Sequence, residues 1–263
     1  MSDPALRAAA TGMRAQEIRS QAIANNLANV GTVGFKRSRP QFEDLMYQTV
    51  QGQAVLGGPE TQTIPEIQVG RGTRLSSVQR IHDQGAMEQT GRPLDLAIEG
   101  DGFFQVQLPD GSLAYSRAGN FSISDQGALV TPGGYTVVPG IRVPQDASGV
   151  TISRTGIVTA LRGQNTEPEE IGRIELARFS NAAGLRAMGE NLYTATPASG
   201  TPGVGVPGEE GFGTLQQGAL ESSNVEIVTE MTDMIQTMRA YELCSKAIKT
   251  CDEMGQVATA LVR

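Results

Sequence analysis

The stretch SSNVEIVTEMTDMIQTMRAYELCSKAIKTCDEM, residues 222–254, decides how this sequence is interpreted. Its apolar side chains return every three or four residues with no proline between them, and the repeat continues to Leu261. Such a repeat places the apolar side chains along one face of an α-helix. Ser223 followed by Glu226 is a capping-box pattern, so we expect the helix to begin there. A helix this long needs a partner for its apolar face.

The N-terminal segment offers such a partner. Asp3 and Pro4 resemble a helix start, with a capping side chain followed by proline at the first helical position. Apolar residues then recur as far as Val30, and Gly31 and Gly34 are typical helix stops. We therefore predict that the two terminal helices pair as a coiled-coil-like stem. The residues that we assign to the seam of this stem are Leu6, Met13, Ile23, Leu27, Ile227, Met231, Met234, Met238, Tyr241 and Ile248.

The middle of the chain has a different texture. From Thr73 to Tyr193 short alternating runs and turn formers dominate, as in Phe104–Leu108 followed by Pro109–Gly111. Alternation of this kind is typical of half-buried strands joined by hairpin turns. The chain has 32 Gly, 13 Pro and no Trp, a composition that suits many short strands. We expect an all-β domain between the two helices, and hence an α+β fold.

These patterns divide the chain into five predicted parts. Residues 1–35 form the N-terminal stem helix, and residues 222–263 form the C-terminal one. Residues 36–72 are predicted as an extended loop or linker with isolated strand candidates, either loose on the surface or lying on a neighbouring molecule. Residues 73–197 form a β-rich outer domain, and residues 198–221 form a linker rich in glycine and proline.

Composition and charge exclude several classes of protein. The formal net charge is −7 with acidic and basic residues interspersed, so there is no basic patch for nucleic acid. No run of about 18 apolar residues occurs, so we predict no membrane span. The start MSDPALRAAATGM lacks the features of a secretory signal peptide, which indicates the cytoplasm or export without a cleaved signal. The single histidine, His82, cannot supply a histidine cluster for a metal, and we expect no metal site and no cofactor.

Functions from other classes stay open at this level. A Ser-His-Asp triad is defined by geometry, and His82 and Asp83 have Ser76 and Ser77 nearby in the sequence. No G-x-S-x-G nucleophile elbow is present, so we predict that the protein is not an enzyme. A surface-binding β module, such as an adhesin, would not need apolar stripes at both termini. The stem itself is either an intramolecular hairpin or a surface that packs against the stems of many copies.

The two cysteines, Cys244 and Cys251, lie seven residues apart in the C-terminal helical stretch. That spacing is about 10 Å along a helix axis, which is too far for a disulfide within the chain. We interpret both as small apolar seam residues, with intermolecular bridging or metal binding as the alternatives.

Three segments resemble the signatures of the bacterial flagellar rod and hook family. They are ANNLANVGTVGFKR at residues 24–37, GDGFFQVQLPDGSLAYSRAGNF at residues 100–121 and the opening stretch at residues 222–254. The segments occur in the family's order, and the resemblance extends over essentially the whole chain. The residues that we assign to the family motifs are Asn25, Asn26, Leu27, Asn29, Gly34, Phe35, Lys36, Gly102, Phe103, Phe104, Asn224, Val225, Arg239, Tyr241, Glu242 and Lys246. The sequence departs from the usual family pattern at Ser116, Ala118, Met238 and Cys244.

The resemblance implies a structural function. The chain length and the fragment FEDLMYQTV, residues 42–50, are similar to the distal rod subunit of the family, with another rod or hook subunit as the alternative. Such a subunit is exported by the flagellar export apparatus and polymerises into a hollow helical drive shaft that transmits torque from the motor to the hook. The implied partners are further copies of the chain, proximal rod proteins, hook or hook-junction proteins, the ring bushing and the rod cap. The implied location is the basal body, from the periplasmic space to the outer membrane.

Overall fold

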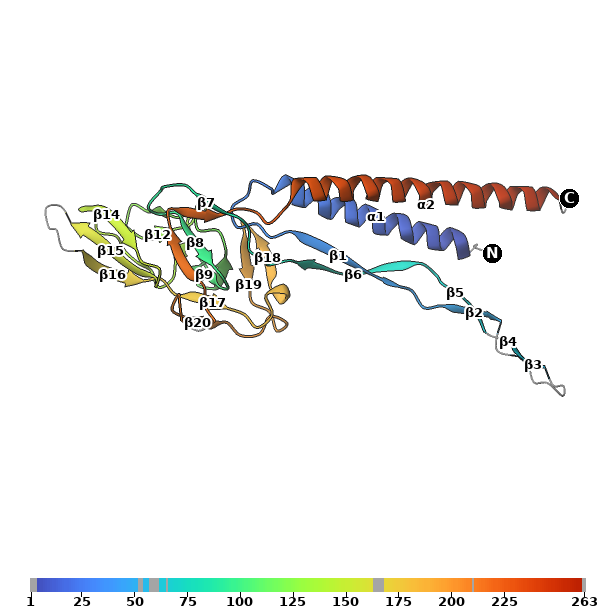
Figure 1. Ribbon diagram of the computed structural model, residues 1–263, viewed down its shortest axis with the longest axis horizontal. Coiled ribbons are helices and arrows are strands. Elements are labelled where there is room, and N and C mark those ends of the chain that lie inside the picture. The colour runs from blue at the N-terminus through green and yellow to red at the C-terminus, as the bar shows by residue number, and fades with distance from the viewer. Residues whose placement is uncertain are drawn as a thin grey trace. The chain divides into compact units, whose positions relative to one another are not determined.

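The structure, a computed structural model, describes residues 4–51, 54–56, 62–64, 66–162, 168–209 and 211–261. The chain forms two compact units, whose elements are labelled in Figure 1. The helix unit covers residues 1–27, 38–79 and 227–263, and the β unit covers residues 28–37 and 80–226. An N-terminal helix, a β-rich middle and a C-terminal helix follow one another along the chain, so the predicted α+β class is confirmed.

Two antiparallel helices form the centre of the helix unit, α1 (Pro4–Ala28) and α2 (Ile227–Leu261). Gly12 lies opposite Cys244, and the ion pair between Arg19 and Asp233 joins the helices further along. A Cβ on Gly12 would lie 3.2 Å from Cys244 Sγ, so the missing side chain allows a close approach of the two helices. The terminal helices thus pair, as predicted. Within the described residues, neither helix is long and apolar enough to cross a membrane.

The start of α2 differs from the predicted capping box. The helix begins at Ile227, and Ser223 Oγ instead accepts a hydrogen bond from the Val225 backbone N–H at 3.3 Å. This bond forms a tight turn before the helix. The predicted start at Ser223 is wrong because Asn224, one residue further on, is held inside the β unit by the hydrogen bonds given below.

The segment predicted as an extended loop is a β arm. Its strands pair in three steps: β1 (Ser38–Asp44) with β6 (Thr73–Arg80), β2 (Gln48–Gln51) with β5 (Ile67–Val69), and β3 (Ala54–Leu56) with β4 (Gln62–Ile64). β1, β2, β4 and β6 are largely polar, and β3 and β5 have only three residues each, so hydropathy does not reveal the strands. Pairing across the arm satisfies their backbone groups, which is a non-local effect. The chain from residue 73 to 79, which we predicted to open the β domain, belongs to this arm.

The β unit contains a nine-stranded sheet with β9 (Phe103–Gln107) inside it. β9 pairs with β10 (Leu113–Ser116) across the predicted hairpin turn, with Ala114 opposite Val106. The strand order is β11-β12-β13-β9-β10-β19-β18, and β17 pairs with both β9 and β20. The remaining strands are β11 (Ser122–Ile123), β12 (Leu129–Val130), β13 (Thr136–Val137), β17 (Leu176–Arg178), β18 (Arg186–Gly189), β19 (Leu192–Thr194) and β20 (Gly203–Gly205).

Smaller sheets complete the β unit. β14 (Ala147–Ile152), β15 (Ile157–Arg162) and β16 (Glu169–Arg173) form a three-stranded sheet, and a short 3-10 helix, η1, covers Ala182–Gly184. Two further pairs are β7 (Met87–Gln89) with β22 (Ala219–Glu221), and β8 (Leu96–Glu99) with β21 (Thr214–Gln217). The predicted linker at residues 198–221 therefore contains three strands of the β unit. Pro207, Gly208, Gly211 and Gly218 lie in turns between these strands, and Gly203 and Gly205 lie within β20.

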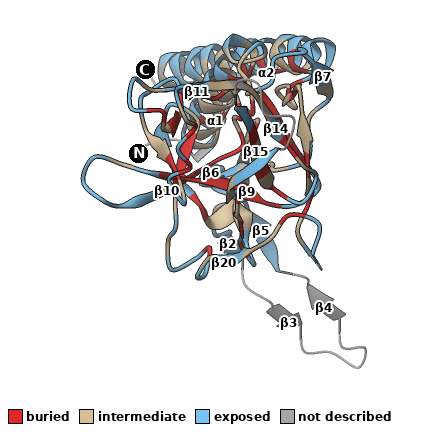
Figure 2. Ribbon diagram, turned by 90° about the vertical axis from the view of Figure 1, so that its left-hand side faces the viewer, coloured by how far each residue is buried: buried red, intermediate tan, exposed pale blue. Residues whose placement is uncertain are grey.

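β9 is buried on both of its faces, as Figure 2 shows by colour. Phe104 packs in the main core against Phe121, at a ring-centroid distance of 5.0 Å. Phe103 points to the opposite side, into a second cluster with Phe179 and Tyr193. Edge-to-face pairs of this kind add about 0.5–1.5 kcal/mol each to the burial of the rings. The central motif thus anchors two cores at once.

Candidate functional site: a buried clasp and an exposed helix flank

Glu221 is a buried carboxylate at the end of β22, and it receives three donors within the β unit. Lys36 Nζ lies 2.5 Å from its Oε1, and the Gly85 N–H donates to the same oxygen at 2.8 Å. Arg117 Nη1 lies 3.5 Å from Oε2. Lys36 also donates to the carbonyl oxygen of Asp83 at 2.6 Å. Lys36 and Glu221 are both fully buried, so each depends on the other for a counter-charge.

Asn224 joins three segments of the β unit with one side chain. Its Oδ1 accepts a hydrogen bond from the Arg37 N–H at 2.8 Å. Its Nδ2 donates to the carbonyl oxygens of Ile81 at 2.8 Å and Asp83 at 3.1 Å. The chain that enters the β unit is thereby fixed to the chain that leaves it. We define the clasp as Lys36, Arg117, Glu221 and Asn224.

The clasp places two cations beside one carboxylate. Burial lowers the pKa of the Lys36 ammonium, and the neighbouring Glu221 opposes that shift. The pKa of the Arg117 guanidinium is lowered by burial in the same way. Arg117 Cζ also lies 5.2 Å over the ring of Phe103, and the electron-rich ring face offsets part of the excess positive charge.

The turn that leads into the clasp requires glycine at position 34. Gly34 has a φ of +67°, and its N–H donates to the Glu221 carbonyl oxygen at 2.8 Å. A Cβ at this position would lie 2.6 Å from the backbone nitrogen of Ala118. Glycine alone has both the required backbone conformation and the required lack of volume. Two residues later the chain delivers Lys36 to Glu221.

Asn26 makes a comparable set of hydrogen bonds inside the helix unit. The side chain is buried; its Oδ1 accepts from the Ser38 N–H at 2.8 Å and its Nδ2 donates to the Ser38 carbonyl oxygen at 3.0 Å. Nδ2 also lies 3.2 Å from Oε2 of Glu230, a buried carboxylate in the first turn of α2. Three elements therefore meet at Asn26: the end of α1, the start of β1 and the start of α2.

Neither of the buried ring nitrogens of His82 has a hydrogen-bond partner among the residues that the structure describes. The rings of Phe103 and Tyr193 pack edge-to-face against the imidazole, with centroid distances of 5.6 and 5.4 Å. A triad base must be hydrogen-bonded both to its nucleophile and to an orienting carboxylate, and His82 is bonded to neither. The Ser76 hydroxyl instead donates to Glu43 at 2.6 Å. The geometry therefore does not support the catalytic triad that the sequence left open.

We expect the β unit to lose stability between pH 6.5 and pH 4 because of His82. Burial, joined by the positive charges of Lys36, Arg117 and Arg80, lowers the pKa of His82 from 6.5 to about 4. In the unfolded chain His82 becomes protonated near pH 6.5, whereas in the folded protein it stays neutral until about pH 4. The stabilisation is therefore complete above pH 6.5 and decreases by about 3 kcal/mol as the pH falls through 4.

The measurement is the free energy of unfolding of the wild type and of His82→Phe between pH 4 and 7. Phenylalanine keeps an aromatic ring between Phe103 and Tyr193 but cannot be protonated. The variant should show the shallower decline, and the decline that remains reports the carboxylates. Parallel curves for the two proteins would contradict the assignment to His82.

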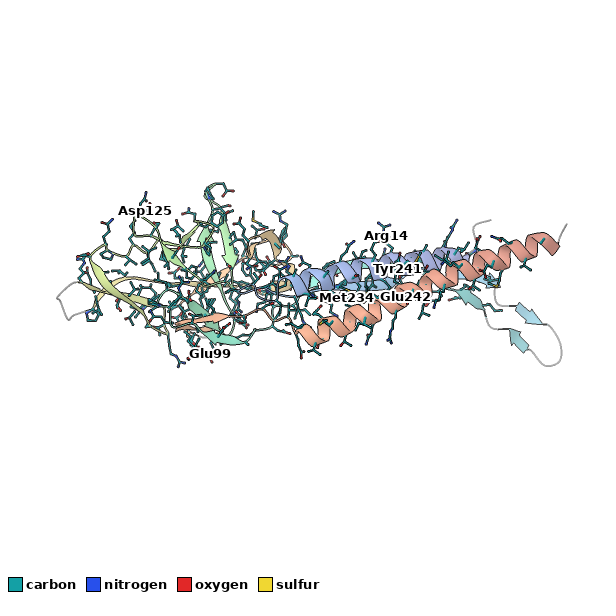
Figure 3. All side chains as sticks on the ribbon, turned by 90° about the horizontal axis from the view of Figure 1, so that it is seen from above. Arg14, Glu99, Asp125, Met234, Tyr241 and Glu242 are labelled. Atoms are coloured by element: carbon teal, nitrogen blue, oxygen red, sulfur yellow. The ribbon has the colours of Figure 1, made fainter. Side chains whose placement is uncertain are left out.

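On α2, the residues that we predicted to form a single seam occupy two faces of the helix. Figure 3 shows the side chains along the helix, with Met234 and Tyr241 labelled. Met234 and Ile248 are half-buried next to α1, and Met234 Sδ accepts a hydrogen bond from Ser20 Oγ at 3.3 Å. The others on α2 are exposed, with exposed fractions of 47% for Ile227, 53% for Met231, 59% for Met238 and 46% for Tyr241. On α1, Ile23 is buried, and the half-buried members are Leu6, Met13 and Leu27.

Four of the exposed apolar side chains lie along one flank of α2. Ile227, Met231, Ile235 and Met238 lie within a sector of about 80° when successive residues turn by 100°. We define these four residues as the α2 flank. The face next to α1 carries Met234 and Ile248 together with smaller or polar side chains, among them Thr237 and Cys244. Large apolar side chains gathered on the outside of a paired helix are typical of an interaction surface.

Comparison with known proteins identifies this architecture. Family models match the chain in three places: flagella basal body rod protein at residues 6–36, flagellar hook protein FlgE/F/G D1 domain at residues 97–160, and flagellar basal body rod FlgEFG protein C-terminal at residues 216–261. The flagellar basal-body rod protein FlgG of Caulobacter vibrioides is 47% identical over 258 residues, which cover 98% of each chain. The FlgG of Borreliella burgdorferi is 48% identical over 261 residues, again 98% of each chain. The chain belongs to the flagellar basal-body rod protein FlgG family.

Other relatives agree with this assignment. The FlgG of Bacillus subtilis is 39% identical over 258 residues, 96% of this chain and 97% of the relative. The rod protein FlgF of Caulobacter vibrioides is 34% identical over 242 residues, 90% of this chain and 88% of the relative. The FlgG type is therefore favoured over the second rod type that the sequence left open. The protein is a structural subunit of the flagellar rod.

The predicted motif residues of this rod protein fall into three groups. Several are packed in the interior: Asn26, Phe35, Phe103, Phe104 and Val225 are buried, and Gly102 lies against Leu176 with a φ of +148°. Others build the clasp and its turn, namely Gly34, Lys36 and Asn224, while Asn29 accepts hydrogen bonds from Thr32. The rest lie on helix surfaces: Asn25 is exposed and Leu27 half-buried on α1, and Arg239, Tyr241, Glu242 and Lys246 are exposed on α2. Their role in self-assembly stays a prediction.

The two cysteines of the rod protein, Cys244 and Cys251, are free and half-buried on α2. The place of Cys244 opposite Gly12 agrees with a small residue in the seam. Within the described ranges there is no group of three or more His, Cys, Asp and Glu side chains that could hold a metal ion.

Proposed function

We propose that this chain polymerises through its paired helices into the hollow helical distal rod of the flagellum, a drive shaft that carries torque from the motor to the hook. The α2 flank carries this proposal. Its side chains are large and apolar, but they are exposed in the single subunit, so only another molecule would remove them from water. α1 does not cover them because it occupies the neighbouring face of α2.

The clasp supports the mechanical part of the proposal. Buried charges and hydrogen bonds connect Lys36, Arg117, Glu221 and Asn224 with the backbone around Asp83. A force applied where the chain enters or leaves the β unit is therefore shared by several strands. Buried polar networks rigidify a fold and favour one arrangement where their groups are paired, as most of the polar atoms of the clasp are; Arg117 Nε has no hydrogen-bond partner among the described residues.

The β arm is a further candidate contact between subunits. Among the described residues of the arm, the exposed large apolar side chains are Met46, Tyr47, Val50, Ile67, Val69, Leu75 and Val78. We infer that the arm lies over an adjacent subunit and adds a second layer of contact to that of the helices. A shaft that must not bend benefits from subunits that touch their neighbours at more than one radius.

The partners and location follow from this role. We propose that the rod meets proximal rod proteins at one end and hook or hook-junction proteins at the other, with ring proteins as a bushing around it. Assembly would follow export without a cleaved signal, under a rod cap. The location is the basal body between the periplasmic space and the outer membrane.

The test is to locate the protein in purified basal bodies. An epitope inserted between Asp110 and Gly111 lies in an exposed turn after β9, where insertions disturb a sheet least. We expect immunogold label along the rod next to the hook, in cells that still swim, with an untagged strain as the control. Label on the cell surface, or absence of the protein from purified basal bodies, would contradict the proposal.

A further inference from the structure

A hollow of about 650 Å³ lies in the helix unit where the β arm meets α1. α1 contributes Arg7 and Thr11 to its wall, and the arm contributes Leu45, Met46, Arg71 and Arg74. Three arginines and one acidic residue, Asp44, therefore surround a largely aliphatic space. A guanidinium binds a carboxylate through two parallel hydrogen bonds and tolerates partial burial. The hollow thus suits a ligand that carries both carboxylates and an apolar side chain.

The hollow is held open by specific packing. Gly72 has a φ of +110°, and a Cβ there would overlap the hydroxyl of Thr11. The Leu45 N–H donates to the Gly72 carbonyl oxygen at 2.8 Å, and the Thr73 N–H donates to Thr11 Oγ1 at 3.3 Å. Any other residue at position 72 would push the arm away from α1. The arginine side chains of the arm are therefore presented from a fixed position.

The helix unit also carries a segment with the complementary chemistry. α2 has 35 residues and α1 has 25. Since Gly12 lies opposite Cys244, the first residue of α1, Pro4, lies opposite a position near Asp252. Beyond that position α2 continues past the described part of α1. Asp252, Glu253 and Met254 are all exposed there.

The charges of the two surfaces match. Asp252 accepts a hydrogen bond from Gln256 at 3.2 Å, and among the described residues neither Asp252 nor Glu253 forms an ion pair. Arg71 likewise forms no ion pair with a described residue, whereas Arg74 pairs with Glu43 at 3.0 Å. Two carboxylates followed by a methionine are the combination that the arginines and the aliphatic wall of the hollow can accommodate.

The two surfaces cannot meet within one chain. Thr11 contacts the arm, whereas its neighbour Gly12 faces α2, so α1 separates α2 from the hollow. α2 is unbroken from Ile227 to Leu261 and does not fold back. A contact between different surfaces of identical molecules repeats from copy to copy, and a repeated contact of this kind builds rings or open helical polymers.

We propose that the hollow receives the acidic end of α2, Asp252–Met254, from a second copy of this chain. The inference rests on the proposed polymerisation and names one contact that would hold the polymer together. The arm then serves two subunits at once, because its base forms a socket for the helix end of a neighbour.

Charge reversal tests the contact. Arg71→Glu and the pair Asp252→Lys with Glu253→Lys should each raise the critical concentration for polymerisation about tenfold or more. The chain that carries all three substitutions should assemble within about threefold of the wild type, because the attraction is restored with opposite sign. Arg39→Glu is the matched control, since Arg39 is exposed on β1 and does not line the hollow. Sedimentation of the polymer gives the critical concentration.

The outcomes separate this contact from the polymer itself. A wild-type chain that stays monomeric at high concentration would overturn both the polymer and the contact. A wild-type polymer that tolerates Arg71→Glu, or a triple variant that fails to recover, would overturn the contact alone. A loss for Arg39→Glu equal to that for Arg71→Glu would also overturn it, because any added negative charge on the arm would then suffice.

Discussion

Glu221→Gln should lower the free energy of unfolding of the β unit by about 3–5 kcal/mol. Glutamine has nearly the shape of glutamate and can still accept the Gly85 N–H, so packing is preserved. The substitution removes the negative charge that compensates Lys36 and Arg117. In the wild type, Lys36 Nζ and Arg117 Nη1 lie 2.5 and 3.5 Å from the Glu221 carboxylate, and both cations stay buried in the variant. Removal of one partner of a buried ion pair is costly because the other charge remains desolvated.

Hydrogen exchange of the β9 amides measures this loss. The chain has no tryptophan, and exchange reports the β unit separately from the helices. Glu99→Gln is the matched control, because Glu99 is exposed and lies 3.9 Å from an exposed arginine, Arg154. We expect a change of about 0.5 kcal/mol or less for the control. Equal protection of β9 in both variants would show that the clasp does not stabilise the β unit.

A second variant separates charge from shape. Lys36→Met together with Glu221→Gln removes one cation and its partner at the same time, so the double variant should lose less than the sum of the two single variants. Arg117 keeps an uncompensated charge, so recovery should be incomplete. Strict additivity would mean that Lys36 and Glu221 do not interact through their charges.

The sequence predicted those parts of the fold that depend on local repeats. The helices follow from apolar steps of three and four, and the hairpin between β9 and β10 follows from alternation around Pro109–Gly111. The clasp has no such signature. Lys36 and Glu221 are 185 positions apart, and each looks like an ordinary surface charge in its own segment. One feature could have indicated the burial of Glu221: it lies two residues after Ala219 in β22, so both side chains point to the same, buried face of the strand.

The β arm and the start of α2 show two further limits. Strands such as β2 and β5, with four and three residues, are too short to show a clear repeat, and their pairing partners lie across the arm rather than along it. At α2 a good local pattern was overridden. The capping box at Ser223 was available, but the hydrogen bonds of Asn224 to Arg37, Ile81 and Asp83 hold the chain in the β unit until Ile227.

The α2 flank separates polymerisation from folding more clearly than any other surface. From the sequence we predicted that Met234 and Met238 lie in one seam, because both positions fit the repeat of apolar residues every three or four positions. The structure places Met234 against α1 and leaves Met238 exposed. Substitutions at these two positions should therefore affect different properties of the protein: stability at Met234 and assembly at Met238.

Met238→Asp is expected to abolish assembly, or to raise the critical concentration at least about a hundredfold, while the subunit stays folded. The Met238 side chain is 59% exposed, so an aspartate in the free subunit remains hydrated and costs about 0.5 kcal/mol or less. In the polymer the same carboxylate would be buried against apolar side chains without a partner. That burial costs about 3 kcal/mol or more at each interface, which corresponds to about a hundredfold in affinity.

Gln236→Asp is the control for this prediction. Gln236 is exposed and lies about 160° from Met238 around α2, outside the α2 flank, and it receives the same charge in the same helical turn. Thermal unfolding should be alike for the wild type and both variants, and electron microscopy should show polymers for the wild type and Gln236→Asp only. If Met238→Asp assembles like the wild type, the flank is not the interface. If both variants fail, assembly depends on the charge of α2 as a whole, and the apolar flank loses its special role.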